Sequence, residues 1–378
     1  MQQATLLMYH RDIQKNIEKR LNDKKIVIIT GARQVGKTSL IEAILSKESY
    51  LELNGDDMAD RAFFEEINTE KLRSYVGNHT YLFVDEAQKI PNIGDALKII
   101  HDKIKTIKVL VTGSSSFDLN QKIQESLTGR KWEFSLFPIS WSEYVAKHGL
   151  LTAQKQLESR LIYGMYPDVL NNPGDESDIL KALSSSYLFK DIFALHTLKR
   201  PELLDKIIRA LAYQVGSEVS YNEIAQLVGA DKNTVNHYIE LLCQAFVIYK
   251  LPSFSRNLRN EIKTSQKIYF YDNGIRNVVI GNLQPLHLRN DAGQLWENFL
   301  ISERLKYNAY QQRMAKSYFW RTTTRREIDY VEDRDGQISA FECKWSAHKK
   351  TKADKEFQEV YNTQIKILDR ETWDDFVR

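Results

Sequence analysis

This 378-residue chain has few cysteines, no long apolar run and little excess of charge of either sign. Its two cysteines, Cys243 and Cys343, lie far apart and form neither a zinc-binding spacing nor a disulfide framework, which fits a reducing cytoplasm. No apolar run approaches the length that spans a membrane. The N-terminal segment has neither the cationic lead nor the long apolar core of a secretory signal. We therefore expect a cytoplasmic protein without a membrane partner.

The balance of charge leaves the class of partner open. The net charge is only +3, from 53 basic and 50 acidic residues, so the composition neither demands nor excludes nucleic acid, and any basic surface must be local. The eight histidines are scattered without the spacing of metal ligands. The length is sufficient for two or three domains, each with a core of its own.

The most informative stretch runs from Gly31 to Thr38 and reads G-A-R-Q-V-G-K-T. It matches the phosphate-binding loop pattern G-x-x-x-x-G-K-S/T and stands between an apolar run and a helical run, as that pattern requires. The glycines let the backbone curl so that its N–H groups converge on an anion, at a helix end whose dipole is positive. We expect Lys37 to reach the β- and γ-phosphates of ATP, and the Thr38 hydroxyl to bind Mg²⁺. The predicted nucleotide-binding residues are Gly31, Ala32, Arg33, Gln34, Val35, Gly36, Lys37, Thr38 and Ser39.

A second nucleotide motif is the pair Asp85-Glu86, which ends the apolar run 81–84. A carboxylate at the tip of a strand beside the phosphate loop can hold Mg²⁺ through its water shell. An adjacent glutamate can orient the attacking water or accept its proton. The pair therefore predicts Asp85, with Thr38, as a metal residue and Glu86 as a catalytic residue. The alternative, a strand end that simply meets solvent, is weaker because a phosphate loop lies upstream.

Two further features of this region are less specific. After the predicted strand 108–113, the candidates for sensing the γ-phosphate are Thr112, Ser114 and Ser115, of which Ser115 is the catalytic candidate; such polar residues are also common in turns. Arg130 precedes the predicted strand 132–136. It would stabilise charge on the γ-phosphate in its own chain or across a subunit interface, and a surface salt bridge accounts for it equally well.

Strands and helices alternate over the first part of the chain, which predicts an α/β class with a parallel sheet covered on both faces. The strands are expected at 26–30, 50–54, 81–86, 108–113 and 132–136. We expect an AAA-like ATPase domain over 1–145 and a helical lid or connector over 146–200.

Residues 201–284 predict a winged helix-turn-helix. A capping box at Ser220 opens one helix, Gly229 ends it, and Asp231 caps the next, before strands at 247–251 and 267–271. The candidate DNA-binding residues are Lys232, Asn233, Thr234 and Asn236 at the start of the second helix, and Arg256, Arg259 and Lys263 between the strands. Such modules also bind proteins, and this helix start carries one lysine and no arginine, so double-stranded DNA and a protein partner stand as even alternatives.

The block 285–378 carries a constellation typical of metal-dependent nucleases. Glu342 and Lys344 stand two apart on a predicted strand and share one face, and Asp329 lies on the preceding strand. Asp329 and Glu342 would clamp Mg²⁺, Lys344 would position a water or stabilise developing charge, and Glu297 would complete the metal shell from a helix. The alternative is a strand whose Glu and Lys pair in solvent.

With these residues in hand, the chain from about Arg11 onward resembles a prokaryotic ATPase family. That family joins an AAA-like domain to a C-terminal DUF4143-type domain with a PD-(D/E)xK nuclease-like, small α+β restriction-endonuclease-like fold. The stretches that carry the resemblance are 31–38, 82–88, 112–116, 127–130, 269–274 and 341–344. The resemblance implies an ATPase core of the additional-strand type, with Glu86 as its catalytic glutamate, and nuclease-fold positions for Asp329, Glu342 and Lys344. Ile328 replaces the proline of the name-giving pattern.

Three functions follow from these patterns. The leading one is a Mg²⁺-dependent ATP-hydrolysing protein whose C-terminal modules couple turnover to DNA or another partner. A homo-oligomer formed through the ATPase domain is one arrangement that this function allows. The second is an ATP-regulated, metal-dependent DNA endonuclease. The third is a nucleotide-dependent switch that binds a protein partner and no nucleic acid.

Overall fold

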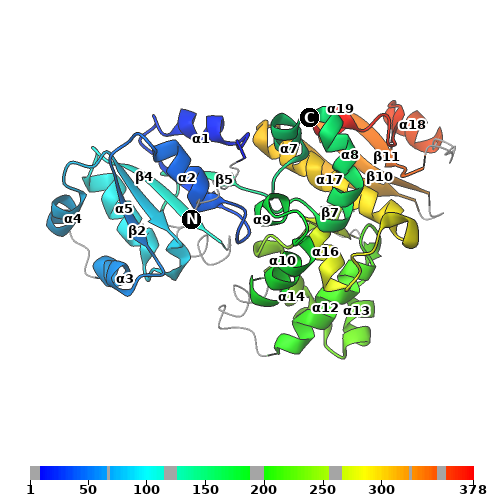
Figure 1. Cartoon of the computed structure of the whole chain (residues 1–378), viewed down its shortest axis with the longest axis horizontal. Coiled ribbons are helices and arrows are strands. Elements are labelled where there is room, and N and C mark those ends of the chain that lie inside the picture. Colours follow the sequence, from blue (N-terminus) through cyan, green and yellow to red (C-terminus); the bar gives the residue numbers. More distant parts are fainter. Residues whose placement is uncertain are drawn as a thin grey trace.

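The computed structural model describes residues 9–65, 69–114, 126–187, 200–254, 266–322, 326–346 and 355–378. These residues form two lobes, one built from the N-terminal third of the chain and the other from the rest (Figure 1). No helix within the described ranges is both long and apolar enough to cross a membrane.

A five-stranded parallel sheet forms the centre of the first lobe. Its order is β2-β3-β4-β1-β5. The strands are β1 (Ile26–Thr30), β2 (Tyr50–Asn54), β3 (Tyr81–Asp85), β4 (Lys108–Gly113) and β5 (Lys131–Ser135). Since β4 lies between β1 and β3 and all neighbours are parallel, the predicted α/β fold with an additional strand is confirmed.

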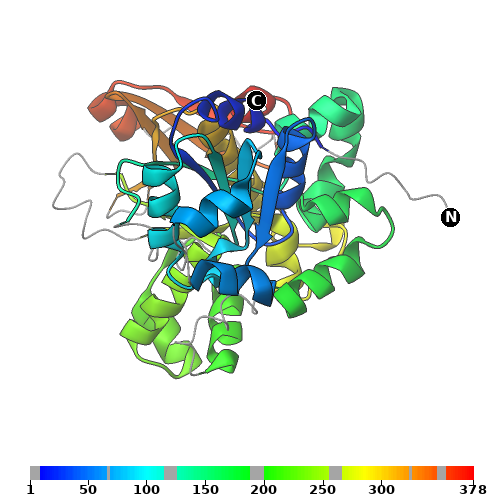
Figure 2. The same ribbon diagram turned by 90° about the vertical axis from the view of Figure 1, so that its left-hand side faces the viewer.

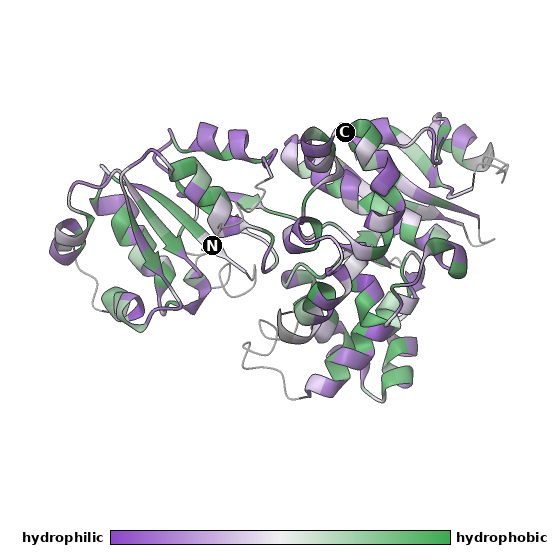
Figure 3. Cartoon of the chain, in the orientation of Figure 1, coloured by the Kyte–Doolittle hydropathy of each residue, from purple (hydrophilic) through white to green (hydrophobic). Residues whose placement is uncertain are grey.

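Helices cover both faces of this sheet, because alternate residues of each strand point to opposite sides. Val27 and Ile29 of β1 share one apolar cluster with Leu40 of α2, whereas Ile26 and Ile28 belong to the other cluster. The helices of the lobe are α1 (Gln14–Arg20), α2 (Lys37–Leu45), α3 (Met58–Glu65), α4 (Thr69–Val76) and α5 (Ile93–Lys103). Figure 2 looks onto this lobe, and Figure 3 shows its strands as mainly hydrophobic and its helices as a mixture of hydrophobic and hydrophilic residues.

The second lobe begins with the segment predicted to be helical. Its helices are α7 (Trp141–His148), α8 (Leu150–Tyr163), α9 (Pro167–Asn171) and α10 (Glu176–Ala182). Helix α7 starts at a capping box, in which the Ser140 side chain accepts from Glu143 N and the Glu143 carboxylate accepts from Ser140 N.

Three helices and a small antiparallel sheet follow, in the region that was predicted to be a winged helix-turn-helix. They are α12 (Pro201–Tyr213), α13 (Tyr221–Val228) and α14 (Lys232–Gln244), with β6 (Glu218–Val219), β7 (Ile248–Pro252) and β8 (Gln266–Phe270). The sheet order is β6-β8-β7. Ser220 and Asp231 cap α13 and α14 as predicted, and Gly229 ends α13 at φ 71°. We call α12 to β8 the middle module.

A small α+β unit completes the chain, as predicted. Helix α17 (Ala292–Tyr310) packs on a sheet of order β12-β11-β10-β9, in which only β11 and β12 are parallel. The strands are β9 (Lys316–Arg321), β10 (Glu327–Arg334), β11 (Gln337–Cys343) and β12 (Ile365–Leu368). The described part of this lobe also contains the helices α16 (Asn273–Val279), α18 (Lys355–Tyr361) and α19 (Asp374–Val377).

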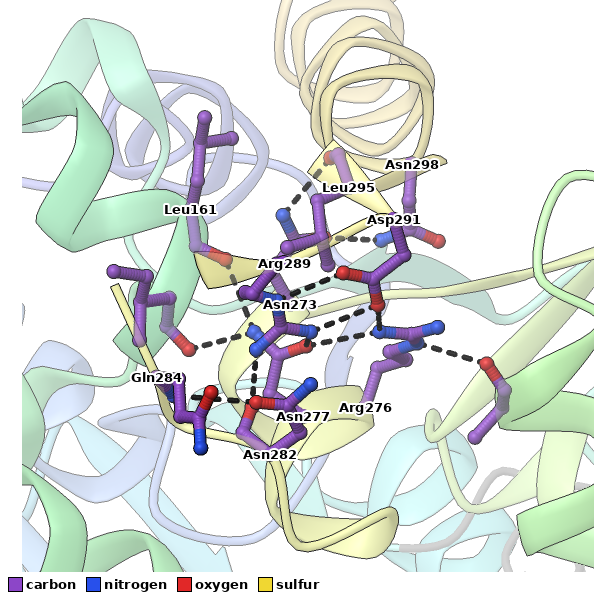
Figure 4. Close-up of polar contacts among 12 residues, drawn as sticks. Leu161, Asn273, Arg276, Asn277, Asn282, Gln284, Arg289, Asp291, Leu295 and Asn298 are labelled. Carbon is purple, nitrogen blue, oxygen red and sulfur yellow. Dashed lines mark hydrogen bonds and ion pairs between the residues drawn. The ribbon is translucent and has the colours of Figure 1, made fainter. Parts of the chain in front are cut away.

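Helix α16 joins the parts of the second lobe through buried polar contacts (Figure 4). Asn277, fully buried, donates to Leu161 O of α8 at 3.1 Å. Arg276 donates through Nε to Ala212 O of α12 at 2.8 Å and pairs with Asp291, just before α17. One short helix therefore holds three others in register.

The stretch just before α16 is fitted closely to the end of α8. Asp272 accepts from Met165 N at 2.6 Å and caps α16. A Cβ on Gly274 would lie 2.2 Å from Tyr163 O, and one on Gly164 would lie 2.0 Å from Asp272 Oδ1. The stretch 269–274 is thus a structural joint at these residues, which explains its glycine and its aspartate.

Candidate functional site

The phosphate loop connects the end of β1 to the start of α2. Gln34 and Gly36 adopt left-handed backbone conformations at φ 60° and 93°, which produce the curl expected from the motif. Gly31 is required for a different reason, because a Cβ there would lie 2.1 Å from Leu136 O. Leu136 N in turn donates to Thr30 O at 2.7 Å. The loop is therefore seated tightly against the chain that leaves β5.

Lys37 lies within the curl of the loop. Its Nζ donates to Gly31 O at 2.9 Å and to Ala32 O at 2.8 Å, and the residue is only 6% exposed. Thr38 and Ser39 follow in the first turn of α2. The ammonium therefore lies within the loop, next to the N-terminus of α2, where the positive end of the helix dipole favours an anion.

Asp85, at the end of β3, receives three hydrogen bonds. Thr38 Oγ1 donates to Oδ2 at 3.0 Å, while Oδ1 accepts from Glu86 N at 3.0 Å and from the Thr112 hydroxyl. The carboxylate is thereby fixed beside the first turn of α2. A hydroxyl and a carboxylate are hard oxygen donors of the kind that Mg²⁺ prefers, so this pair fits the predicted metal.

The Glu86 carboxylate is held by two side chains. Gln88 donates through Nε2 to Glu86 Oε2 at 2.5 Å and to Ser114 Oγ at 3.0 Å, and Ser114 Oγ lies 3.5 Å from Glu86 Oε2. Glu86 itself has a left-handed backbone, with φ 47°. Sequence reasoning assigned Gln88 no role; the only signal was its position in the stretch 82–88. Ser115, the catalytic candidate, lies outside the described residues.

The predicted role of Arg130 at the γ-phosphate of its own chain is wrong. Arg130 precedes β5, and its carbonyl accepts from Ile26 N at the start of β1, whereas the phosphate loop follows the other end of β1. Five residues of strand separate the two edges by about 16 Å. Its guanidinium instead pairs with Asp102, with 3.1 Å between Nε and Oδ1. Hydrogen bonds from Arg130 and His101 lower the pKa of Asp102 to about 2. The salt-bridge alternative describes this residue.

Arg11, which the sequence did not single out, connects the phosphate loop to the second lobe. Its Nη1 donates to Val35 O at 2.7 Å, and its Nη2 donates to Phe137 O at 2.6 Å and to Tyr310 Oη at 3.3 Å. Its Nε pairs with Glu143 at 3.1 Å. Burial opposes the charge, but Glu143 and Tyr310 outweigh it and raise the pKa of Arg11. A single buried cation therefore contacts the phosphate loop, the segment between β5 and α7, helix α7 itself and α17.

A cavity of about 340 Å³ lies beside the phosphate loop. Its lining includes residues of the loop and of α2, and also residues of the second lobe. Among them are Tyr9, Val35, Gly36, Ser39, Ile139 and Pro167.

The predicted DNA-binding residues are only partly described. Lys232, Asn233 and Asn236 are exposed on one side of the start of α14, and Thr234 is half-buried and bonded to the Asp231 cap. The wing cations Arg256, Arg259 and Lys263 lie outside the described residues.

Each of the three predicted nuclease carboxylates pairs with a lysine. Lys344 Nζ lies 3.2 Å from Glu342 Oε2 and 3.7 Å from Asp329 Oδ2. Glu297 pairs with Lys267 at 3.2 Å. The described ranges contain no group of three or more His, Cys, Asp or Glu side chains placed to hold a metal ion. The predicted shell of Asp329, Glu342 and Glu297 around a metal is therefore not formed.

Comparisons with known proteins agree with this architecture. Residues 23–145 match the AAA domain family AAA_14, residues 292–376 match the domain of unknown function DUF4143, and residues 154–286 match the domain of unknown function DUF8612. An uncharacterized protein of Mycobacterium tuberculosis is 24% identical over 345 residues, covering 90% of this chain and 75% of that protein. One of Haemophilus influenzae is 26% identical over 353 residues, covering 85% and 84%.

Among solved structures, this chain is similar to the Walker-type ATPase PABY2304 of Pyrococcus abyssi. The TM-score is 0.55 at 14% sequence identity, over 72% of this chain and 96% of that one. At this identity the likeness concerns the fold.

Proposed function

We propose that this chain, in which an AAA domain match is followed by a DUF4143 domain match, binds ATP with Mg²⁺ and hydrolyses the bond between its β- and γ-phosphates. The observation that carries the proposal is the convergence of Lys37, Thr38, Asp85 and Glu86 at one edge of the parallel sheet. The bound Mg²⁺ would supply charge neutralisation at the β- and γ-phosphates.

Each residue of the site has a distinct task in this proposal. Lys37 and the loop amides bind the phosphates, and Thr38 and Asp85 hold the metal. Glu86 orients the attacking water and takes its proton, and its tether to Gln88 and Ser114 sets where that carboxylate points. The cavity beside the loop accommodates the base and ribose, since it opens from the same turn of α2.

We infer that nucleotide binding is transmitted to the second lobe. The cavity is lined from both lobes, and Arg11 contacts Val35 of the loop and Tyr310 of α17 at once. A nucleotide that contacts both lobes shifts the equilibrium between their arrangements in proportion to the contacts it makes in each. Hydrolysis would reverse that shift.

Turnover by purified protein with Mg²⁺ tests the proposal. Lys37→Ala should weaken ATP binding and abolish turnover, whereas Glu86→Gln should bind ATP and lower kcat by roughly 100-fold or more. Glu133→Gln is the matched control, because Glu133 is an exposed residue of β5 paired with Lys131 on the surface. If Lys37→Ala retained ATP affinity and turnover, or if Glu86→Gln behaved as the control does, the proposal would be wrong.

The start of α14 supports DNA as the partner that turnover serves. Three exposed polar residues, Lys232, Asn233 and Asn236, stand at the capped N-terminus of a helix that follows a tight turn, as in helices that enter the major groove. Binding to duplex DNA over a salt series is the test, since phosphate contacts weaken as salt rises. We expect Lys232→Ala and Asn236→Ala to weaken binding. If no duplex binds even at low salt, a protein partner is favoured.

A further inference from the structure

Lys267 of β8 is a lysine with its charge buried away from water. The residue is 1% exposed, and its side chain crosses from the middle module to the C-terminal unit. Its Nζ lies 3.2 Å from Glu297 Oε1 of α17 and forms an ion pair with Glu327 of β10. The lysine therefore contacts carboxylates on two elements that belong to another module.

The acidic groups around Lys267 include two of the residues that were predicted to hold a metal. Glu297 is one of the predicted metal residues, and Asp329, another, is near enough to act on the charge of Lys267. On the other side, Lys344 lies 3.2 Å from Glu342 and 3.7 Å from Asp329. The carboxylates that were predicted to hold a metal are thus already paired with two ammonium groups of the same chain.

The charge state of Lys267 follows from its surroundings. Burial alone would lower its pKa, but the negative charges of Glu297, Asp329 and Glu327 more than offset that effect and raise the pKa above its usual range. The ammonium is therefore charged at every physiological pH. A divalent cation entering the same cluster would meet a fixed positive charge in a site with little water to screen it.

We propose that Lys267 occupies the place of the divalent cation in this nuclease-like centre, so that the centre is a charged joint between the middle module and the C-terminal unit and not a nuclease site. This inference goes beyond the proposed ATPase activity and does not depend on it. The chemistry required is only that of a built-in cation: an ammonium balances carboxylates that would repel one another, and it remains bound because it is part of the chain.

Neighbouring residues of the middle module fit the same joint. Tyr269, two residues after Lys267 on the same face of β8, donates to Glu297 Oε1 at 2.6 Å. The turn before β6 also closes over this carboxylate, because a Cβ on Gly216 would lie 3.2 Å from Glu297 Oε1. Glu297 is thus held from β8 and from a turn, and its Oε1 accepts hydrogen bonds from both Lys267 and Tyr269.

Manganese binding without nucleotide tests the proposal. All proteins carry Asp85→Asn, which removes the metal residue of the phosphate loop, and bound Mn²⁺ is counted from the loss of the free-ion electron paramagnetic resonance signal. We expect no site in this parent and one new site per chain in Lys267→Met, lost again when Asp329→Asn is added. Lys306→Met is the matched control, because Lys306 is equally buried and pairs with Glu303 on α17, away from this cluster. It should gain no site.

Several results would overturn the inference. One is a Mn²⁺ site in the parent that Asp329→Asn removes, and another is a folded Lys267→Met protein that gains none. DNA cleavage by the wild-type chain with Mn²⁺, abolished by Lys344→Ala, would overturn it as well. If Lys267→Met does not fold, the parent titration and the cleavage assay still decide, and Lys267→Arg should fold and bind no Mn²⁺.

Discussion

Removing the buried cation at the inter-lobe contact should destabilise the protein strongly. The change is Arg11→Met, which keeps the length of the side chain and removes its charge and its donors. Glu143, whose side chain is fully buried, would then lose its only ion-pair partner among the described side chains. The carbonyls of Val35 and Phe137 would each lose a hydrogen bond.

The size of the effect follows from what Glu143 retains. Breaking a buried ion pair by removing one partner costs about 3–5 kcal/mol. Glu143 keeps hydrogen bonds from Asp12 N at 2.9 Å and from Ser140 N at 2.8 Å, so we take the lower end of that range. A loss of about 3 kcal/mol is a large part of the roughly 5–15 kcal/mol that stabilises a typical domain.

A double-mutant cycle in urea measures this contribution. Glu143→Gln removes the uncompensated charge, so Arg11→Met with Glu143→Gln should cost less than the sum of the two single changes. The matched control is Arg209→Met, because Arg209 pairs with Asp205 at 2.7 Å on α12 with side chains 55% and 43% exposed. An exposed pair of this kind should contribute about 0.5 kcal/mol or less. Additive changes at Arg11 and Glu143, or a loss no larger than the control's, would refute the reasoning.

Two other changes have equally definite expectations. Gly31→Ala would place a Cβ 2.1 Å from Leu136 O, a backbone atom that cannot rotate away. We therefore expect its ATP affinity to fall by about tenfold or more in a calorimetric titration. The control is Gly293→Ala, which has open space around it and should bind ATP as the wild type does. An unchanged affinity in Gly31→Ala would contradict this fit. Burial raises the pKa of Glu297 from 4.5 to about 7. Between pH 4.5 and about pH 7, the folded chain therefore keeps a proton that the unfolded chain releases. The contribution of this group to stability is lost as the pH rises through that range. Between about pH 5 and pH 8, the free energy of unfolding of the wild type should therefore fall relative to that of Glu297→Gln. A difference between the two proteins that stays constant with pH would count against the raised pKa of Glu297.

The parts of the site that the sequence predicted are those formed by contiguous residues. The phosphate loop and Asp85-Glu86 could be predicted because each motif lies at a strand end, and parallel strands place those ends at one edge of the sheet. The same rule explains the error at Arg130. That residue precedes its strand, so it had to lie at the opposite edge, and the prediction considered only its nearness to the strand.

The residues that the sequence could not predict act through distant partners. Arg11 bonds to Tyr310 across 299 positions, and Lys267 pairs with Glu297 across 30, in different modules. No periodicity or motif relates such positions, because their proximity arises only when the helices and sheets have packed. The nuclease-like pattern shows the same limit. Glu342 of β11 and Lys344, which follows the end of that strand, form an ion pair at 3.2 Å, but the other lysine of the cluster comes from β8.

The contact between Arg11 and Tyr310 also bears on how the protein is made. A ribosome delivers the chain from the N-terminus, so the phosphate loop and its sheet emerge long before α17. Until then, Arg11 and Phe137 N lack the Tyr310 hydroxyl that each contacts in the finished protein, at 3.3 Å and 3.1 Å. The hydrogen-bond network around Arg11 in a nascent chain is therefore incomplete until α17 has been synthesised, and a chain cut short before residue 310 would carry an intact phosphate-loop motif without this contact.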